Sequence, residues 1–208
     1  MSAKRSAAAA LAAGLVGWSW VGPRVPERIH PFVHAALGAA LVAAARAPLG
    51  LHPPPVWSGL KLGVAVAAPV FAGVAASTVA SPVRSAIAGR ELPDSASRWL
   101  AVRIPVGTVW SEEAAFRAAL GTVAAEAFGA TGGRLLQSLA FGLSHIPDAR
   151  GAGEPVVRTV LATGVAGWFF ALLRERSGSL AAPMLAHLAI NEAAAVAALG
   201  VQRRGRRP

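Results

Sequence analysis

Seven stretches of the chain consist mainly of apolar residues, and short basic or proline-rich connections separate them. A helix needs about 20 apolar residues to cross a bilayer, and three of these stretches reach that length clearly. The pattern therefore predicts an all-α, polytopic integral membrane bundle of about six to eight transmembrane or membrane-embedded helices. The apolar stretches are 7–22, 32–51, 57–80, 104–130, 135–147, 155–173 and 179–200, with 57–80, 155–173 and 179–200 the clearest spans.

The stretch 135–147 is too short to cross a bilayer by itself. Two arrangements would accommodate it. It is either the lower part of a longer, bent helix or a helix buried among others, where irregular geometry at membrane depth is tolerated. The pattern of residues leaves both open.

The composition supports a membrane protein, with 54% hydrophobic and only 14% charged residues, against about a quarter charged in soluble domains. Twenty basic residues face ten acidic ones, but they form no stripe interleaved with stacking aromatics, so we expect no nucleic-acid partner. Basic residues between apolar segments suit contact with anionic membrane lipid instead. The absence of cysteine excludes a disulfide framework, a thiolate metal site and a cysteine nucleophile.

Arginines cluster in 84–103 and in the tail at 203–207, which places both segments on the cytoplasmic side of a membrane. Two segments on the same side of a membrane must be separated by an even number of crossings. Four apolar segments lie between these two, so the number is even. If the three earlier apolar segments also cross the membrane, Lys4 and Arg5 lie on its outer side. Basic residues normally favour the cytoplasmic side, so either one early segment does not span the membrane or the preference of this pair is overridden. The first 13 residues also resemble the charged region and apolar core of a signal peptide, which we expect to be retained.

The first unusual polar group lies within the apolar stretch 104–130. An ionisable residue at mid-bilayer costs roughly 2.5 to 3.5 kcal/mol on insertion scales, so it needs a partner, a cavity or a function. Glu113 and Arg117 are four residues apart on one helix face, where they can neutralise each other, while Glu112 points about 100° away. An alternative is that the two acids only begin a helix at the membrane surface.

Two further groups follow. His145 lies four residues after Phe141 at the end of an apolar stretch and before a proline, where a lone histidine is commonly structural. His187 and Asn191 are also four residues apart and share one face of the last long stretch, which is unlikely to be a lipid-facing one. Their alternative role is interhelical hydrogen bonding, worth about 1 kcal/mol each.

The other ionisable residues point to no chemistry. His30, His34 and His52 lie near proline-rich connections, and we expect them at the membrane interface. The roles of Glu126 and Glu192 stay open.

Several kinds of protease are excluded by the residues available. Asp94 and Asp148 lie in connections, so no paired-aspartate site can form within the membrane. Neither His145 nor His187 is followed by Glu, which excludes a His-Glu-x-x-His zinc site. No Gly-x-Ser-x-Gly or Gly-x-Ser-Gly motif occurs, and Ser144 beside His145 points elsewhere on a helix. Water activated by a carboxylate, with imidazole and amide groups around the scissile carbonyl, is the chemistry left.

The segments 112–117, 141–145 and 187–191 resemble the three motifs of the CPBP (CAAX protease and bacteriocin-processing) family. The family pattern is Glu-Glu-x-x-x-Arg, then Phe-x-x-x-His, then His-x-x-x-Asn or Asp, and every defining position is present in order. The resemblance implies the all-helical fold of the type II CAAX prenyl endopeptidase and an intramembrane endopeptidase activity.

The resemblance also implies residue roles. Glu112, assisted by His145, would hold and deprotonate the attacking water, and His187 and Asn191 would donate hydrogen bonds to the developing oxyanion. The supporting residues would be Glu113, Arg117 and Phe141.

The chain is expected to have three parts. Residues 1–99 supply N-terminal membrane-spanning helices, 100–200 the CPBP-like catalytic core, and 201–208 a basic cytoplasmic tail. The substrate is expected to be a peptide or protein, membrane-associated or lipidated proteins included. Alanine- and arginine-rich usage suggests a GC-rich bacterial genome and hence the bacterial inner membrane.

Three alternatives stay open. No cofactor is favoured, but zinc held by His145, His187 and Glu112 with an open water position would also fit a hydrolase. Intramembrane Glu and His residues also serve transporters and proton relays. A non-catalytic peptide-binding or immunity protein could retain the same helices.

Overall fold

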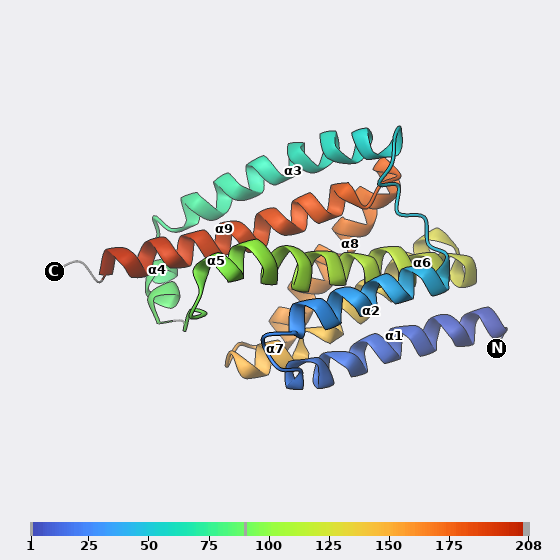
Figure 1. Ribbon diagram of the computed structural model, residues 1–208, viewed down its shortest axis with the longest axis horizontal. Helices are drawn as coiled ribbons and strands as arrows, with labels where there is room; N and C mark the ends of the chain where they lie inside the picture. The colour runs from blue at the N-terminus through green and yellow to red at the C-terminus, as the bar shows by residue number, and fades with distance from the viewer. Residues whose placement is uncertain (1, 90, 206–208) are drawn as a thin grey trace.

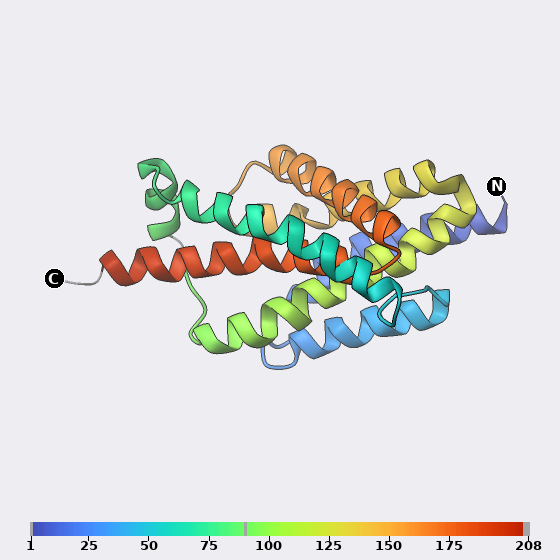
Figure 2. The same cartoon turned by 90° about the horizontal axis from the view of Figure 1, so that it is seen from above.

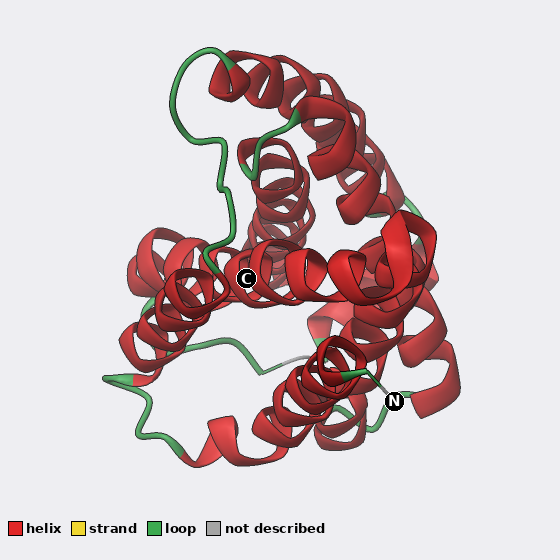
Figure 3. Cartoon of the chain, turned by 90° about the vertical axis from the view of Figure 1, so that its right-hand side faces the viewer, coloured by secondary structure: helices red, strands yellow, loops and turns green. Residues whose placement is uncertain are grey.

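The computed structural model describes residues 2–89 and 91–205, and these ranges contain helices and connecting loops but no strand (Figure 3). The all-α prediction is therefore confirmed. Most helices run along the long axis of an elongated bundle (Figure 1). In chain order, the elements are α1 (Ala3–Val21), η1 (Gly22–Arg24), α2 (His30–Ala45), α3 (Pro55–Ser77), α4 (Ser81–Ala88), α5 (Ala96–Arg98), η2 (Trp99–Trp110), η3 (Glu113–Leu120), α6 (Gly121–Ser144), α7 (Ile146–Gly151), α8 (Val156–Ser177) and α9 (Ala181–Gly205).

In the part of the chain that the structure describes, three helices are long and apolar enough to cross a membrane, namely α3, α8 and α9. They correspond to the three clearest predicted spans. Large apolar side chains on their outer surfaces are exposed, among them Phe71 on α3 and Leu161 and Val165 on α8. Apolar surface of this extent is rare on soluble monomers and suits contact with lipid. The protein is an integral membrane protein.

Close packing of α3 against α9 depends on small residues. A Cβ added at Gly63 would lie 2.8 Å from Leu185 Cδ1 and 3.1 Å from Ala182 Cα, so only glycine allows this approach. Such small-residue contacts replace the hydrophobic drive that is absent between helices in lipid. The views in Figures 1 and 2 agree that the two helices lie side by side.

The chain bends sharply inside α6. Gly129 has φ 75° and ψ 172°, which is not helical, and the helix continues beyond it in a new direction (Figure 2). A Cβ at Gly133 would lie 2.6 Å from the backbone nitrogen of Ala125, so the two parts of α6 touch next to the bend. The predicted short segment 135–147 is thus the later part of a broken helix, packed against α1 and α8.

The termini lie at opposite ends of the bundle (Figure 1). The connection around α4 and α5 lies at the same end as the C-terminal part of α9, consistent with one membrane side for both arginine clusters; Arg90, Arg206 and Arg207 lie outside the described residues. Lys4 lies at the other end, where it forms an exposed ion pair with Glu126 at 3.2 Å. This arrangement matches the alternative in which the N-terminal pair is overridden.

The first helix belongs to the core of the bundle. Ala8, Ala12 and Leu15 of α1 are buried in one cluster with Phe116 of η3 and Phe141 of α6. Loss of this helix would expose the apolar surfaces of η3 and α6.

Candidate active site

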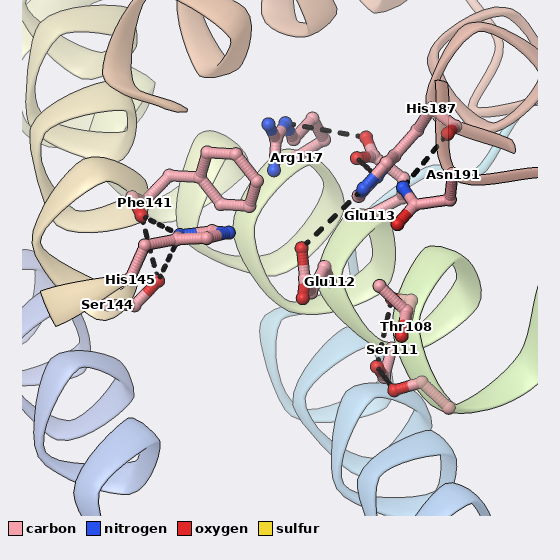
Figure 4. Close-up of polar contacts among 11 residues, drawn as sticks. Thr108, Ser111, Glu112, Glu113, Arg117, Phe141, Ser144, His145, His187 and Asn191 are labelled. Carbon is pink, nitrogen blue, oxygen red and sulfur yellow. Dashed lines mark hydrogen bonds and ion pairs between the residues drawn. The ribbon is translucent and has the colours of Figure 1, made fainter. Parts of the chain in front are cut away.

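A cavity of about 800 Å³ lies between the helices and contains residues from all three motifs. Its lining includes Glu112, Phe141, His145, His187 and Asn191, which come from the η2–η3 junction, α6 and α9. Figure 4 shows Glu112 and His187 on one side and His145 with Phe141 on the other. Segments separated by up to about 80 positions in the sequence therefore meet at one cavity.

The paired glutamates face in different directions. All eight residues of η3, from Glu113 to Leu120, are buried, whereas the Glu112 side chain is 28% exposed. Glu113 and Arg117 form an ion pair at 3.4 Å between Oε2 and Nε, with both side chains 0% exposed. The helical period predicts this separation, because consecutive residues point in different directions.

Aromatic rings complete the surroundings of Arg117. Its guanidinium lies 3.8 Å from the Phe141 ring centroid and 5.0 Å from that of Phe170. None of its nitrogens makes a hydrogen bond, so Glu113 and these rings offset its buried charge. Phe141 therefore both lines the cavity and covers the ion pair behind it.

His187 connects the two glutamates. Its Nδ1 lies 2.8 Å from Glu113 Oε1, and its Nε2 lies 3.8 Å from Glu112 Oε2. The ring stacks on Phe170 with centroids 5.0 Å apart and an interplanar angle of 24°. Because an ionised carboxylate only accepts hydrogen bonds, Nδ1 carries a proton and Nε2 is the nitrogen that faces the cavity. Glu113 thus orients the imidazole as well as pairing with the arginine.

Asn191 lies one turn further along α9. Its Nδ2 donates a hydrogen bond to the backbone carbonyl of His187 at 3.1 Å. An amide nitrogen carries two protons, so one N–H is left for another acceptor in the cavity. The local bond fixes the orientation of the amide.

His145 extends from the end of α6 toward Glu112 (Figure 4). Its Nδ1 donates to the backbone carbonyl of Phe141 at 2.8 Å, because a carbonyl can only accept. Nε2 of the neutral ring is then the basic nitrogen. Ser144 Oγ donates to the same carbonyl at 2.8 Å and lies 3.4 Å from His145 Nδ1, so the hydroxyl is not directed at the basic nitrogen. This geometry argues against a serine nucleophile here.

Two histidines expected at the membrane interface, His30 and His34, line the same cavity, and their position at the interface stays a prediction. His30 and His34 are half-buried on α2, and their rings stack with centroids 3.9 Å apart. Trp18 of α1 lies beside them. His30 and His34 are four residues apart at the beginning of an apolar stretch, and His187 and Asn191 of the third motif have the same spacing. This spacing was the feature of the sequence that could have indicated a place at the cavity. His52 is exposed in the α2–α3 connection.

Within residues 2–89 and 91–205, no three His, Asp or Glu side chains gather closely enough to hold a metal ion. The candidate zinc ligands Glu112, His145 and His187 line one cavity but do not form such a group. The Nδ1 atoms of both histidines are engaged by Phe141 and Glu113. The zinc-dependent alternative stays a prediction.

Comparisons with known proteins bear on these motifs. Residues 94–193 match the family model described as Rce1-like, type II CAAX prenyl endopeptidase. The matched segment contains all three motifs. The comparisons with curated proteins and with solved structures found no match. Residues 94–193 are therefore similar to the Rce1-like type II CAAX prenyl endopeptidases, which agrees with the CPBP family whose three motifs the sequence carries.

Proposed function

We propose that this protein is an intramembrane endopeptidase that hydrolyses a peptide bond with a water activated by Glu112 and His145. One observation carries the proposal: of the two adjacent glutamates, only Glu112 lines the cavity, and its side chain is 28% exposed whereas that of Glu113 is 0% exposed. A carboxylate in that state is available to take a proton from water. Nε2 of His145 supplies a second acceptor from the other side of the cavity.

The groups of the site can accept and return every proton that moves during hydrolysis. The water oxygen attacks the carbonyl carbon, and one water proton passes to Glu112. Asn191 Nδ2 and, when its ring carries both protons, His187 Nε2 donate hydrogen bonds to the oxyanion. Glu112 then returns the proton to the departing amine nitrogen as the carbon–nitrogen bond breaks and the carbonyl re-forms.

Glu113 and Arg117 act behind the cavity. Glu113 holds Nδ1 of His187, and Arg117 neutralises Glu113, so the imidazole keeps one orientation. Outer groups of this kind determine how well the groups that touch the substrate are aligned. Phe141 and Phe170 fix the arginine and the imidazole by ring contacts.

The site is proposed to be reached from the end of the bundle that carries the arginine clusters, in a bacterial inner membrane. The cavity lining extends to Pro23 and Val25 in the α1–α2 connection and to Asp148 in α7. Those connections lie toward the C-terminal end of the bundle in Figure 1. The native absence of cysteine allows single cysteines at positions 23 and 5 to be labelled from either side. Labelling of position 23 from the outside would contradict this orientation.

The proposed activity is tested by peptide cleavage with purified protein in lipid. Glu112→Gln, His145→Ala and His187→Ala are each expected to abolish cleavage, while Glu126→Gln, outside the cavity, leaves it unchanged. Addition of a strong chelator has no effect if water is activated by the glutamate alone. Loss with chelator and recovery with zinc would favour the metal-dependent alternative, and full activity of Glu112→Gln would exclude the proposed base.

A further inference from the structure

One wall of the cavity comes from outside the segment that matches the family model. Trp18 of α1 and His30 and His34 of α2 line it, in the same cavity as the motif residues of α6 and α9. α1 packs mainly against α6, and α2 packs against η2 and η3. The family motifs assign no role to this wall.

Ring contacts hold the wall in one arrangement. His30 and His34 stack at 3.9 Å with an interplanar angle of 26°, and Trp18 lies 5.5 Å from His34 at 53°. His34 also lies against Gly22, where an added Cβ would come within 2.8 Å of Nε2. The orientation of the polar ring atoms is therefore determined before any ligand binds.

Three buried polar atoms of this wall have no hydrogen-bond partner, namely Trp18 Nε1, His30 Nδ1 and His34 Nε2. A buried donor without a partner costs about 1 to 3 kcal/mol, so such atoms are rare and need an explanation. The indole N–H can only donate. A ligand of this wall must therefore present a hydrogen-bond acceptor.

The charges near the wall favour a neutral acceptor. Arg103 forms an ion pair with Glu27 at 3.1 Å, and Asp148 also lines the cavity. Two carboxylates thus accompany one guanidinium, which disfavours an anionic ligand. Main-chain carbonyls of a peptide are neutral acceptors. A peptide is also the substrate proposed for the motif residues of this cavity.

We infer that Trp18 and His30 form a substrate-binding subsite that hydrogen-bonds the main chain of the peptide whose scissile bond lies at Glu112, with the Trp18 N–H donating to a main-chain carbonyl. This inference rests on the proposed function. The N-terminal helices would then select and align the peptide, and the matched segment would carry the chemistry.

Trp18→Phe removes the N–H and keeps an aromatic ring, and His30→Leu removes both ring nitrogens. Each change is expected to raise KM about two- to tenfold, the size of one neutral hydrogen bond, with kcat within about twofold. Trp20→Phe and His52→Leu are matched controls, because both residues are exposed and neither lines the cavity. Both controls should keep the wild-type KM.

Binding is measured separately in the inactive Glu112→Gln background, by fluorescence anisotropy of the fluorescein-labelled library peptide that binds most tightly. Trp18→Phe should weaken binding about two- to tenfold, and an amidated C-terminus should leave it unchanged. Unchanged binding in both wall variants, binding lost on amidation, or no peptide bound at all would overturn the subsite. This binding measurement needs no turnover. It therefore tests the subsite even if no cleavage is observed and the proposed function is wrong.

Discussion

The ion pair between Glu113 and Arg117 gives the sharpest test of how the site is supported. Glu113→Gln removes the negative charge but keeps a carbonyl oxygen that can accept from His187 Nδ1. Arg117 would then be a buried cation with no carboxylate and no hydrogen bond. The variant therefore isolates the contribution of charge compensation.

The expected loss of stability in Glu113→Gln follows from the burial of the ion pair. Breaking a buried pair by removing one partner costs about 3 to 5 kcal/mol. Both side chains are 0% exposed, so solvent screens little of this cost. The rings of Phe141 and Phe170 still attract the cation, which places the expected loss near the lower end, about 3 kcal/mol. For a chain of this length, that corresponds to a fall in Tm of about 6 to 12 °C.

The double variant Glu113→Gln with Arg117→Met tests whether the loss of stability comes from the unpaired guanidinium. It removes both charges and keeps similar volumes, so stability should return to within about 1 kcal/mol of the wild type. Thermal unfolding in one detergent compares the two variants. Glu126→Gln is the matched control, because its ion pair with Lys4 is exposed and should contribute little.

Two results would show that Glu113 does not stabilise the protein by compensating the charge of Arg117. The first is a Tm for Glu113→Gln within about 2 °C of the wild type, which would mean that the charge is compensated elsewhere. The second is a double variant no more stable than the single one, because the loss would then not come from the unpaired guanidinium.

Two further predictions concern the oxyanion donor and helix packing. Asn191→Ala should lower kcat about 100- to 1000-fold with little change in KM, since the lost hydrogen bond forms only in the transition state; an equal rise in KM in steady-state kinetics would contradict this. Gly142→Ala should destabilise the α6–α8 contact by about 1 to 3 kcal/mol, because the new Cβ would lie 2.6 Å from Val160 O. Gly151→Ala, with no atom within 4 Å, is its control in thermal unfolding, and equal Tm values for the two would refute the steric argument.

Properties that depend on one segment could be predicted from the sequence. The long apolar runs correspond to α3, α8 and α9, because crossing a bilayer requires a minimum helix length. The separation of Glu112 from Glu113 follows from the helical period. The three motifs also identified the side chains that meet at the cavity, because ionisable residues in apolar helices are few and costly.

Properties that depend on contacts between segments needed the tertiary structure. Nothing local indicates that Gly129, among 22 glycines, takes a positive φ and redirects α6, because that depends on what the next helix packs against. The proline-rich surroundings of His30 suggested an interface; that this residue also lines the cavity depends on the packing of α2 against η2 and η3.

The sequence by itself determined that this is a helical membrane protein with a carboxylate, two histidines and an amide within its motifs. Only the tertiary structure decided that His187 holds Glu113, 74 positions away, while facing Glu112. Periodicity orients a side chain around its own helix, but the partner it meets depends on how separate helices pack.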